Sequence, residues 1–355
     1  MNILFIGKRF YTNRDAYTEK FGRIYQLPYH WSKEVPTSLW LIDYHSREKI
    51  QDKHDHLNII STPIVSFIFI SIIFKIILTQ RPTTIVASGD CYIGLFSYLL
   101  AKICGSKFVF DIYDKYDAFS GYRNLGFKNL YNYLLKNADI CLFASKKLKE
   151  NSENICKKTI LVLNGIDTKH FYPRDKNHSR LHFNLDKDKI YVGYFGSMEI
   201  ERGIDDLIDA VKLLHQKNKK IYILLAGKKR KNLNLQHEFI HYLGNIPFKY
   251  VPIAMACCDI LTLPYRNSAF LDNASSCKIG EYIAMDIPIS MTNANSLIHN
   301  IHLDSAIKDS LANHSDFYAL AHNIKINLNI REKNPQLKYK SWNEISKNCT
   351  AIFNN

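Results

Sequence analysis

Short continuous apolar runs alternate with helix-length segments along the whole chain. The first half contains NILFIG, SLWLIDY, LNIIS, TTIVASG, KFVFDIYD, ADICLFAS and TILVLNG, and the second half contains IYVGYFG, KIYILLAG, HYLG, CDILTLP and IPISM. Apolar strands of this kind are typical of parallel sheets that carry helices on both faces. The pattern therefore predicts two doubly wound α/β units, joined in the polar stretch YPRDKNHSR at residues 172–180.

Length and composition agree with this organisation. A chain of 355 residues exceeds what one ordinary core supports and suits two domains. The 46% hydrophobic and 23% charged residues are typical of a globular protein, and they argue against a disordered or membrane-spanning chain. The net charge of +14 favours phosphate-bearing partners or an anionic membrane surface. Because the basic residues are scattered, we expect no nucleic-acid partner.

Cysteine usage and the N-terminus favour a cytoplasmic location. The eight cysteines form no C-x-x-C pair, and most lie in apolar stretches, as expected of reduced buried thiols. The start MNILFIGKRF has its positive charges after the apolar run, the reverse of a signal peptide. The apolar stretch 59–78 is broken by polar residues and a proline, so we expect a strand that ends near Pro63 and then an apolar helix at 64–78. That helix can rest on an anionic bilayer or be buried against the sheet.

The clearest candidate anion site follows the strand YVGYFG. Ligands of open α/β sheets bind at the carboxyl ends of strands, where helix N-termini offer free N–H groups. Here the strand ends at Gly196, and Arg202 and Gly203 precede an amphipathic helix. An ordinary turn with a solvent-facing arginine explains the same residues. No G-x-x-x-x-G-K-[ST] or G-x-G-x-x-G motif occurs, which argues against a P-loop NTPase or an ordinary dehydrogenase.

The stretch NASSCKIGEYIAMDIPI offers a second candidate site. Four residues can present backbone N–H groups to a phosphate: Asn273, Ala274, Ser275 and Ser276. Lys278 can add positive charge, and Glu281 can accept hydrogen bonds from the vicinal hydroxyls of a ribose. A surface ion pair between a lysine and a glutamate three residues apart on a helix is the alternative.

These stretches, taken in order, resemble a known family. ILVLNGIDTKHFYP, GYFGSMEIERGIDDLIDAVKLL, IYILLAG, CDILTLPY and CKIGEYIAMDIPI are similar to successive signatures of retaining GT-B glycosyltransferases of family four, the glycosyl transferases of group 1. In the first half, VASGDCYIG, FVFDIYDKYDAF and ADICLFASKKL resemble members that build bacterial surface polysaccharides. The resemblance implies two Rossmann-like domains that face a central cleft. It places an acceptor domain at 1–170, a nucleotide-sugar domain at 171–338, and a helix at 339–355 that crosses back to the first domain.

The resemblance also implies roles for the candidate residues. Glu281 would bind the nucleotide ribose, and Arg202 and Lys278 would neutralise the donor diphosphate, with Gly196 and Ser197 beside it. Such enzymes need no metal or other cofactor, and no D-x-D motif stands where a metal site would require it. Negative charge builds on the diphosphate as it leaves, which is the charge that these cations would stabilise.

Three positions depart from the family pattern. The arginine usual after the strand glycine is Ser197, and the first glutamate of the E-x7-E pair is Asn273, which leaves the donor sugar open. The histidine usual after a strand of the first domain is absent, and Asp111 and Asp114 occupy that region. In related members such an aspartate orients the acceptor or stabilises the oxocarbenium ion, whereas capping of the following turn is the structural alternative.

Candidate acceptor residues follow the first strand, in FYTNRDAYTEKFGR. Tyr11, Asn13, Arg14 and Asp15 can stack on and hydrogen-bond a glycan, or can simply form a solvated loop. We therefore expect a glycosyltransferase that moves a sugar from a nucleotide sugar to a glycan or lipid-linked acceptor of bacterial lipopolysaccharide or capsule. The alternatives are a GT-B sugar-nucleotide epimerase and a non-catalytic GT-B relative that binds a glycan or a partner.

Overall fold

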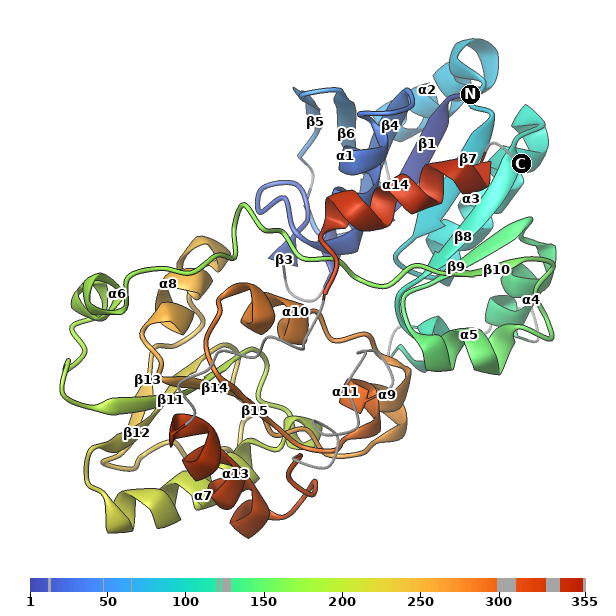
Figure 1. The fold of residues 1–355 in the computed structure, drawn as a ribbon. Coiled ribbons are helices and arrows are strands. Elements are labelled where there is room, and N and C mark those ends of the chain that lie inside the picture. The colour runs from blue at the N-terminus through green and yellow to red at the C-terminus, as the bar shows by residue number, and fades with distance from the viewer. Residues whose placement is uncertain are drawn as a thin grey trace. The chain divides into compact units, whose positions relative to one another are not determined.

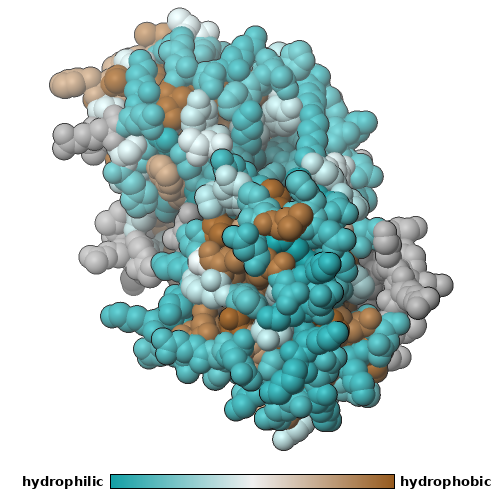
Figure 2. Space-filling view, turned by 90° about the vertical axis from the view of Figure 1, so that its left-hand side faces the viewer, coloured by the Kyte–Doolittle hydropathy of each residue, from teal (hydrophilic) through white to brown (hydrophobic). Residues whose placement is uncertain are grey.

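The structure is a computed structural model, and it describes residues 1–11, 14–46, 48–64, 66–119, 122, 129–298, 311–329 and 339–353. The chain forms two compact units (Figure 1). Unit 1 comprises Met1–Gly165, Asn273–Ser275 and Ser341–Asn355, and unit 2 comprises Ile166–Asp272 and Ser276–Lys340. In the view of Figure 2, hydrophilic residues cover most of the surface and apolar residues form separate smaller patches.

Unit 1 contains an eight-stranded sheet in the order β10-β9-β8-β7-β1-β4-β6-β5. All neighbouring pairs are parallel except β5 with β6, which is antiparallel. The strands are β1 (Ile3–Lys8), β4 (Thr37–Asp43), β5 (Ile50–His54), β6 (Leu57–Pro63), β7 (Thr84–Ser88), β8 (Lys107–Ile112), β9 (Ile140–Phe143) and β10 (Thr159–Leu161). The strand order reverses between β1 and β7, which makes their carboxyl ends the topological switch point of unit 1.

Helices cover both faces of this sheet because alternate strand residues point to opposite sides. Leu4 and Ile6 of β1 pack with the helices α2, η1, α3 and α4, whereas Ile3 and Phe5 pack with α1 and α14. The helices of unit 1 are α1 (Gly22–Trp31), α2 (Phe67–Lys75), the π-helical η1 (Ile76–Gln80), α3 (Cys91–Cys104), the short η2 (Tyr116–Ala118), α4 (Leu130–Asn137), α5 (Lys146–Ser152) and α14 (Trp342–Phe353). A short hairpin of β2 (Phe10–Tyr11) and β3 (Arg14–Asp15) follows β1.

Unit 2 contains a five-stranded parallel sheet in the order β13-β12-β11-β14-β15. Its strands are β11 (Ile190–Phe195), β12 (Ile221–Ala226), β13 (Ile240–Tyr242), β14 (Ile260–Leu263) and β15 (Ile289–Met291). Its helices are α6 (Lys176–His182), η3 (Ile200–Arg202), α7 (Ile204–Lys217), η4 (Phe248–Tyr250), α8 (Val251–Ala256), α9 (Ala269–Asn273), α10 (Cys277–Ala284), α11 (Asn295–Ile298) and α13 (Phe317–Asn329). The switch point of this unit lies between β11 and β14.

The predicted fold class, α/β with two Rossmann-like doubly wound units, is confirmed. Each of the twelve apolar runs forms a strand, and β6 ends at Pro63 as expected. The short strands β2, β3 and β5 were not predicted, because their residues carry no continuous apolar pattern. In the part of the chain that the structure describes, the cysteines are free thiols and no helix is both long and apolar enough to cross a bilayer.

Candidate functional site

The predicted donor residues of unit 2 lie at its switch point. The connection from β11 to α7 runs from Gly196 to Gly203, and the connection from β14 to α10 runs from Pro264 to Ser276. Because β11 and β14 are parallel neighbours, both connections leave the same edge of the sheet. In a doubly wound sheet this edge forms the ligand crevice.

The side chain of Lys278 lies directly over the backbone of Gly196. A Cβ atom added to Gly196 would overlap the end of the Lys278 side chain, with Nζ only 2.7 Å away. Gly196 also has φ of +151°, which side chains of other residues rarely accept. The lysine belongs to the first turn of α10, so its ammonium adds to the positive end of that helix dipole. Two of the predicted donor residues therefore converge at the carboxyl end of β11.

Arg202 joins the two connections through an aromatic ring. Its guanidinium lies 4.6 Å from the centroid of the Tyr265 ring, and the Tyr265 hydroxyl lies 3.3 Å from Ser276 Oγ. Tyr265 had no predicted role, although its position directly after β14 is the kind of signal that marks a ligand edge. Ser197 also lies here, and its carbonyl accepts a hydrogen bond of 2.8 Å from the buried Tyr194 hydroxyl.

The two connections also interlock at Gly203. This glycine has φ of +67°, and any Cβ at this position would overlap the carbonyl oxygen of Pro264. Next to it, Arg266 donates its backbone N–H to the carbonyl of Glu201 at 2.9 Å, and its guanidinium pairs with Asp206 at 2.6 Å. The hydrogen bond to Asp206 raises the pKa of Arg266. These contacts give the start of α7 a defined position relative to β14.

Glu281 lies one turn after Lys278, on a helix that is anchored to the sheet. The backbone N–H of Phe195 donates to the Tyr282 hydroxyl at 3.0 Å, which ties α10 to the end of β11. Glu281 is half-buried and close enough to His170 to act on its imidazole. Burial lowers the pKa of His170, and the hydrogen bond to the Phe248 carbonyl and the nearby charges oppose this only in part. The buried imidazole therefore favours its neutral form more than an exposed histidine does.

His170 was not predicted as a site residue. It stacks on the Phe248 ring at a centroid distance of 4.3 Å, and its Nε2 lies 3.2 Å from the Phe248 carbonyl oxygen. In the sequence, only its position in the stretch GIDTKHFYP could have marked His170 as a site residue. Its surroundings come from η4, which is far away in the chain.

Three of the predicted donor residues belong to unit 1 rather than to unit 2: Asn273, Ala274 and Ser275. The Asn273 Oδ1 atom accepts a hydrogen bond of 3.1 Å from Asn151, and the Ser275 carbonyl accepts one of 3.2 Å from Asn164. Their predicted role in donor binding stays a prediction.

A pocket of about 320 Å³ opens at the switch point of unit 1. It is lined by Lys8, Phe10, Tyr11, His45, Tyr113, Asp114 and Phe119. Tyr11 and Asp114 were predicted site residues, whereas Lys8 and His45 were missed although each follows the end of an apolar strand. Lys8 Nζ lies 3.7 Å from the carboxylate of Asp90, the N-cap of α3. The structure thus brings one predicted acceptor residue and one predicted catalytic residue into the same pocket.

Asp111 does not line this pocket. Its carboxylate is fully buried, where it accepts hydrogen bonds from Arg23 at 2.6 and 2.8 Å and from the Ser88 hydroxyl at 2.8 Å. Both oxygen atoms are therefore engaged inside unit 1. The capping alternative does not describe Asp111 either, because its partners are on α1 and β7 rather than in the following turn.

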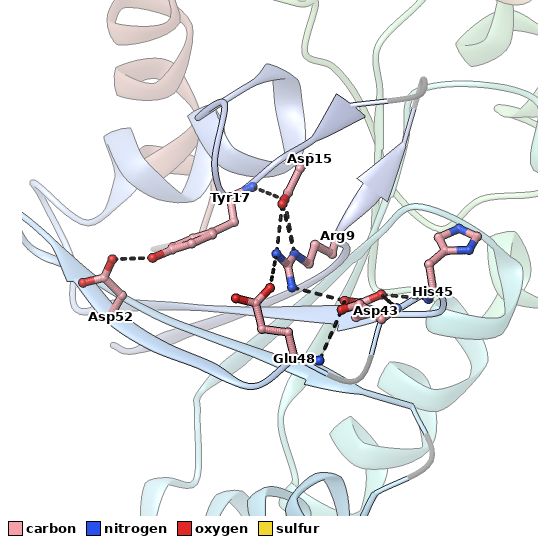
Figure 3. A network of polar contacts seen from close by, with 8 residues as sticks. Arg9, Asp15, Tyr17, Asp43, His45, Glu48 and Asp52 are labelled. Atoms are coloured by element: carbon pink, nitrogen blue, oxygen red, sulfur yellow. Dashed lines mark hydrogen bonds and ion pairs between the residues drawn. The ribbon is translucent and has the colours of Figure 1, made fainter. Parts of the chain in front are cut away.

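Asp15 and Arg14 form ion pairs within unit 1, and Asn13 lies outside the described residues. Figure 3 shows the buried Arg9 side chain among three carboxylates, with Asp15 at 3.0 Å, Glu48 at 2.9 Å and Asp43 at 3.1 Å. Arg14 pairs with Glu19 at 2.8 Å. The cluster around Arg9 connects the β2–β3 hairpin to the segment after β4, and the ring of His45 points away from it (Figure 3).

A second pocket, of about 460 Å³, lies at the amino ends of β1 and β4, the edge opposite to the switch point. Within the described ranges, no group of three or more His, Cys, Asp or Glu side chains could hold a metal ion.

Residues 189–327 match the family model described as glycosyl transferases group 1. No curated protein matches the chain. The match covers most of unit 2, including Arg202, Lys278 and Glu281, and it supports the prediction that the chain is a glycosyltransferase enzyme.

Solved structures resemble the chain over almost its whole length. Sucrose-phosphate synthase from Thermosynechococcus elongatus is 15% identical, with 99% of this chain and 98% of that chain covered and a TM-score of 0.67. HepE from Anabaena, in complex with UDP and glucose, is 14% identical, with 99% of each chain covered and a TM-score of 0.67. The catalytic domain of starch synthase IV from Arabidopsis thaliana, bound to ADP and acarbose, is 10% identical, with 99% and 98% covered and a TM-score of 0.71. At these identities the likeness shows the fold, which is the GT-B fold.

Proposed function

We propose that the protein transfers a sugar from a nucleotide-sugar donor to a glycan or lipid-linked acceptor in the synthesis of bacterial lipopolysaccharide or capsule. The observation that supports this most strongly is the convergence of Lys278 and Arg202 at the switch point of unit 2, with Glu281 one turn further along the same helix as Lys278. We place the reaction in the cytoplasm, with retention of the anomeric configuration and without a metal ion.

The chemistry needs a group that accepts the charge of the leaving diphosphate. As the bond between the anomeric carbon and the diphosphate oxygen breaks, negative charge grows on that oxygen and positive charge grows on the sugar ring. Lys278, Arg202 and the N-terminal N–H groups of α10 are suited to stabilise the diphosphate, while Glu281 binds the ribose hydroxyls. Gly196 lets the diphosphate approach the backbone because it has no side chain.

The pocket of unit 1 suits the sugar acceptor. Four aromatic side chains line it, and such rings offer flat faces against which a sugar ring can lie: Phe10, Tyr11, Tyr113 and Phe119. Asp114, which lines the same pocket, is the side chain that we assign to the reacting centre. The UDP and ADP in the HepE and starch synthase structures support a nucleoside diphosphate as the leaving group.

A panel of nucleoside diphosphates and nucleotide sugars, screened by thermal shift, tests the donor site. A ligand present at 100 times its Kd stabilises the folded state by about 2.7 kcal/mol. We expect the nucleoside diphosphate of one base to raise the melting temperature of the protein. The nucleotide sugar with the same base should then release its nucleoside diphosphate when a cell-envelope extract is added. If no diphosphate shifts the melting temperature, the donor site is misplaced. Binding without any release would instead favour a non-catalytic relative.

A further inference from the structure

A stripe of large apolar side chains is exposed on α2 and η1 of unit 1. Phe67 is 92% exposed, Ile70 51%, Phe74 58% and Leu78 67%. These residues recur at intervals of three and four, so they share one face of the helix. Large apolar patches on a soluble protein mark sites that another surface covers. The sequence left two possibilities for this segment, burial against the sheet or contact with a bilayer. Burial against the sheet explains only the opposite side of the helix, which includes the buried Ile72 and Ile76.

Helix α3, which packs beside η1, carries two further exposed apolar side chains. Leu99 and Ile103 are 52% and 64% exposed and stand one turn apart. The helix contacts η1, and the Ser106 hydroxyl donates to the Pro82 carbonyl at 2.5 Å, which holds the ends of both helices together. The apolar face is defined here by its seven exposed members: Ile64, Phe67, Ile70, Phe74, Leu78, Leu99 and Ile103.

The exposed charges on the segment that carries the apolar face are of one sign. Residues 64–107 contain a single acidic side chain, Asp90, which is buried and accepts hydrogen bonds from the first turn of α3. The exposed charged side chains on these helices and at their ends are all basic: Lys75, Arg81 and Lys102. An apolar stripe with basic residues and no exposed acid is complementary to an anionic lipid surface, where apolar side chains enter the headgroup boundary and cations meet phosphates.

We infer that the apolar face docks unit 1 onto an anionic lipid bilayer. The helices α2 and η1 contain 9 and 5 residues, fewer than the roughly 20 that a bilayer requires. The segment therefore lies on the membrane and does not cross it. The docking rests on exposure and charge, and does not depend on the proposed reaction.

The start of α2 lies near the pocket of unit 1. Ile64 donates its backbone N–H to the carbonyl of Asp43 at 3.2 Å, and His45, two residues further along, lines the pocket. A bilayer against the apolar face thus reaches the edge of the sheet at which the pocket opens. If the proposed transfer is correct, this arrangement favours the lipid-linked acceptor over a free glycan.

Co-sedimentation with vesicles tests the docking. One set of vesicles contains phosphatidylcholine only, and the other contains equal parts of phosphatidylcholine and phosphatidylglycerol. We expect the protein to sediment with the anionic vesicles at low salt and to dissociate at high salt, because exposed charges are screened. The double variant Phe67→Ser with Phe74→Ser should lower the partition coefficient by roughly tenfold or more.

Matched variants separate the apolar face from a general effect of surface leucines. Leu78→Ser should weaken vesicle binding, whereas Leu181→Ser, which changes a leucine of unit 2 that is 74% exposed, should not. Likewise Lys75→Glu with Lys102→Glu should abolish the preference for anionic lipid, and Lys212→Glu on α7 should leave it unchanged. Tryptophan fluorescence checks that each variant is folded.

Three results would overturn the inference. The first is wild-type protein that stays in solution with anionic vesicles at low salt. The second is equal binding of the Leu78→Ser and Leu181→Ser variants. The third is a dimer in lipid-free solution that Phe67→Ser with Phe74→Ser converts to a monomer, since that result would assign the face to a second copy of the chain.

Discussion

The guanidinium of Arg23 and the carboxylate of Asp111 form an ion pair that is almost completely excluded from solvent, with an N–O distance of 2.6 Å. Arg23 comes from α1 and Asp111 from β8, so the pair connects a helix on one face of the sheet to a central strand. The Arg23 guanidinium also donates to the Val162 carbonyl at 2.5 Å, which adds the segment after β10. The Arg23 side chain thus connects α1, β8 and the segment after β10.

Asp111→Asn should destabilise unit 1, because it leaves the buried guanidinium without a counter-charge. Breaking a buried ion pair costs about 3–5 kcal/mol. The three tryptophans of the chain all lie in unit 1, so tryptophan fluorescence during urea unfolding measures this loss separately from unit 2: Trp31, Trp40 and Trp342. An unchanged unfolding midpoint would show that the pair contributes no net stability.

Asp114→Asn should lower turnover far more than donor affinity, if Asp114 acts at the reacting centre. The lost interaction would then be one that forms in the transition state. Donor binding by calorimetry and nucleotide release by a coupled assay separate the two effects. Glu150→Gln, which alters an exposed carboxylate on α5, serves as the control. Turnover equal to that of the control would leave Asp114 without a catalytic role.

Arg202→Ala should weaken binding of the nucleoside diphosphate but not of the matching nucleoside, because its charge acts on the diphosphate. Glu281→Gln should weaken both, since its charge strengthens hydrogen bonds to the ribose, a loss of about 1–3 kcal/mol. Isothermal titration with both ligands measures this difference. Lys212→Ala on α7 is the control. Wild-type affinity in both variants would contradict the donor site.

Gly196→Ala should lower diphosphate affinity by displacing Lys278. Gly244→Ala provides a matched control, because Gly244 also has positive φ, +78°, but a Cβ there would meet nothing within 4 Å. Each substitution puts a side chain on a backbone with positive φ, which lowers the free energy of unfolding by about 1–3 kcal/mol. Only Gly196→Ala should change the Kd for the diphosphate, as measured by calorimetry. Equal affinities would mean that the position of Lys278 does not matter for binding.

Unit 1 should lose stability below about pH 4 in part through Asp43. Burial alone would raise the pKa of Asp43, but hydrogen bonds from Ser46 and His45 and the charge of Arg9 outweigh burial and lower it. The unfolded carboxyl then binds a proton at a higher pH than the folded one. The stabilisation is complete above the unfolded pKa and disappears as the pH falls through the folded pKa.

The Asp43→Asn variant should therefore show a shallower loss of stability in this acid range, and lower stability at neutral pH. Tryptophan fluorescence during urea unfolding at several pH values measures both. The hydrogen bonds around Asp43 in Figure 3 are the structural origin of the effect. Parallel pH profiles for the variant and the wild type would exclude Asp43 as their source.

The candidate site was predictable only where a short stretch of chain contains the signal. Gly196 follows the end of one apolar run, and Arg202 lies in the connection after it. Lys278 and Glu281 lie on the helix between two later apolar runs, so both stretches of unit 2 could be identified. The contact between the two connections, in which Arg202 lies over the Tyr265 ring, could not be predicted, because these residues are more than sixty positions apart. The contact of His170 with Phe248, 78 positions away, could not be predicted for the same reason. Lys8 and His45 follow different strands, and only the pairing of those strands in the sheet brings both residues to one pocket.

The sequence by itself determined the fold class and the twelve main strands, because these follow from local apolar periodicity and from the geometry of parallel strands. Tertiary structure alone decided the surroundings of each charged side chain. Asp111 and Asp114 look alike in the sequence, yet one is enclosed by Arg23 and the other lines a pocket. Likewise only packing decides which side of the apolar helix is buried, because the whole segment is apolar and its pattern does not distinguish the side that faces the sheet from the side that faces solvent.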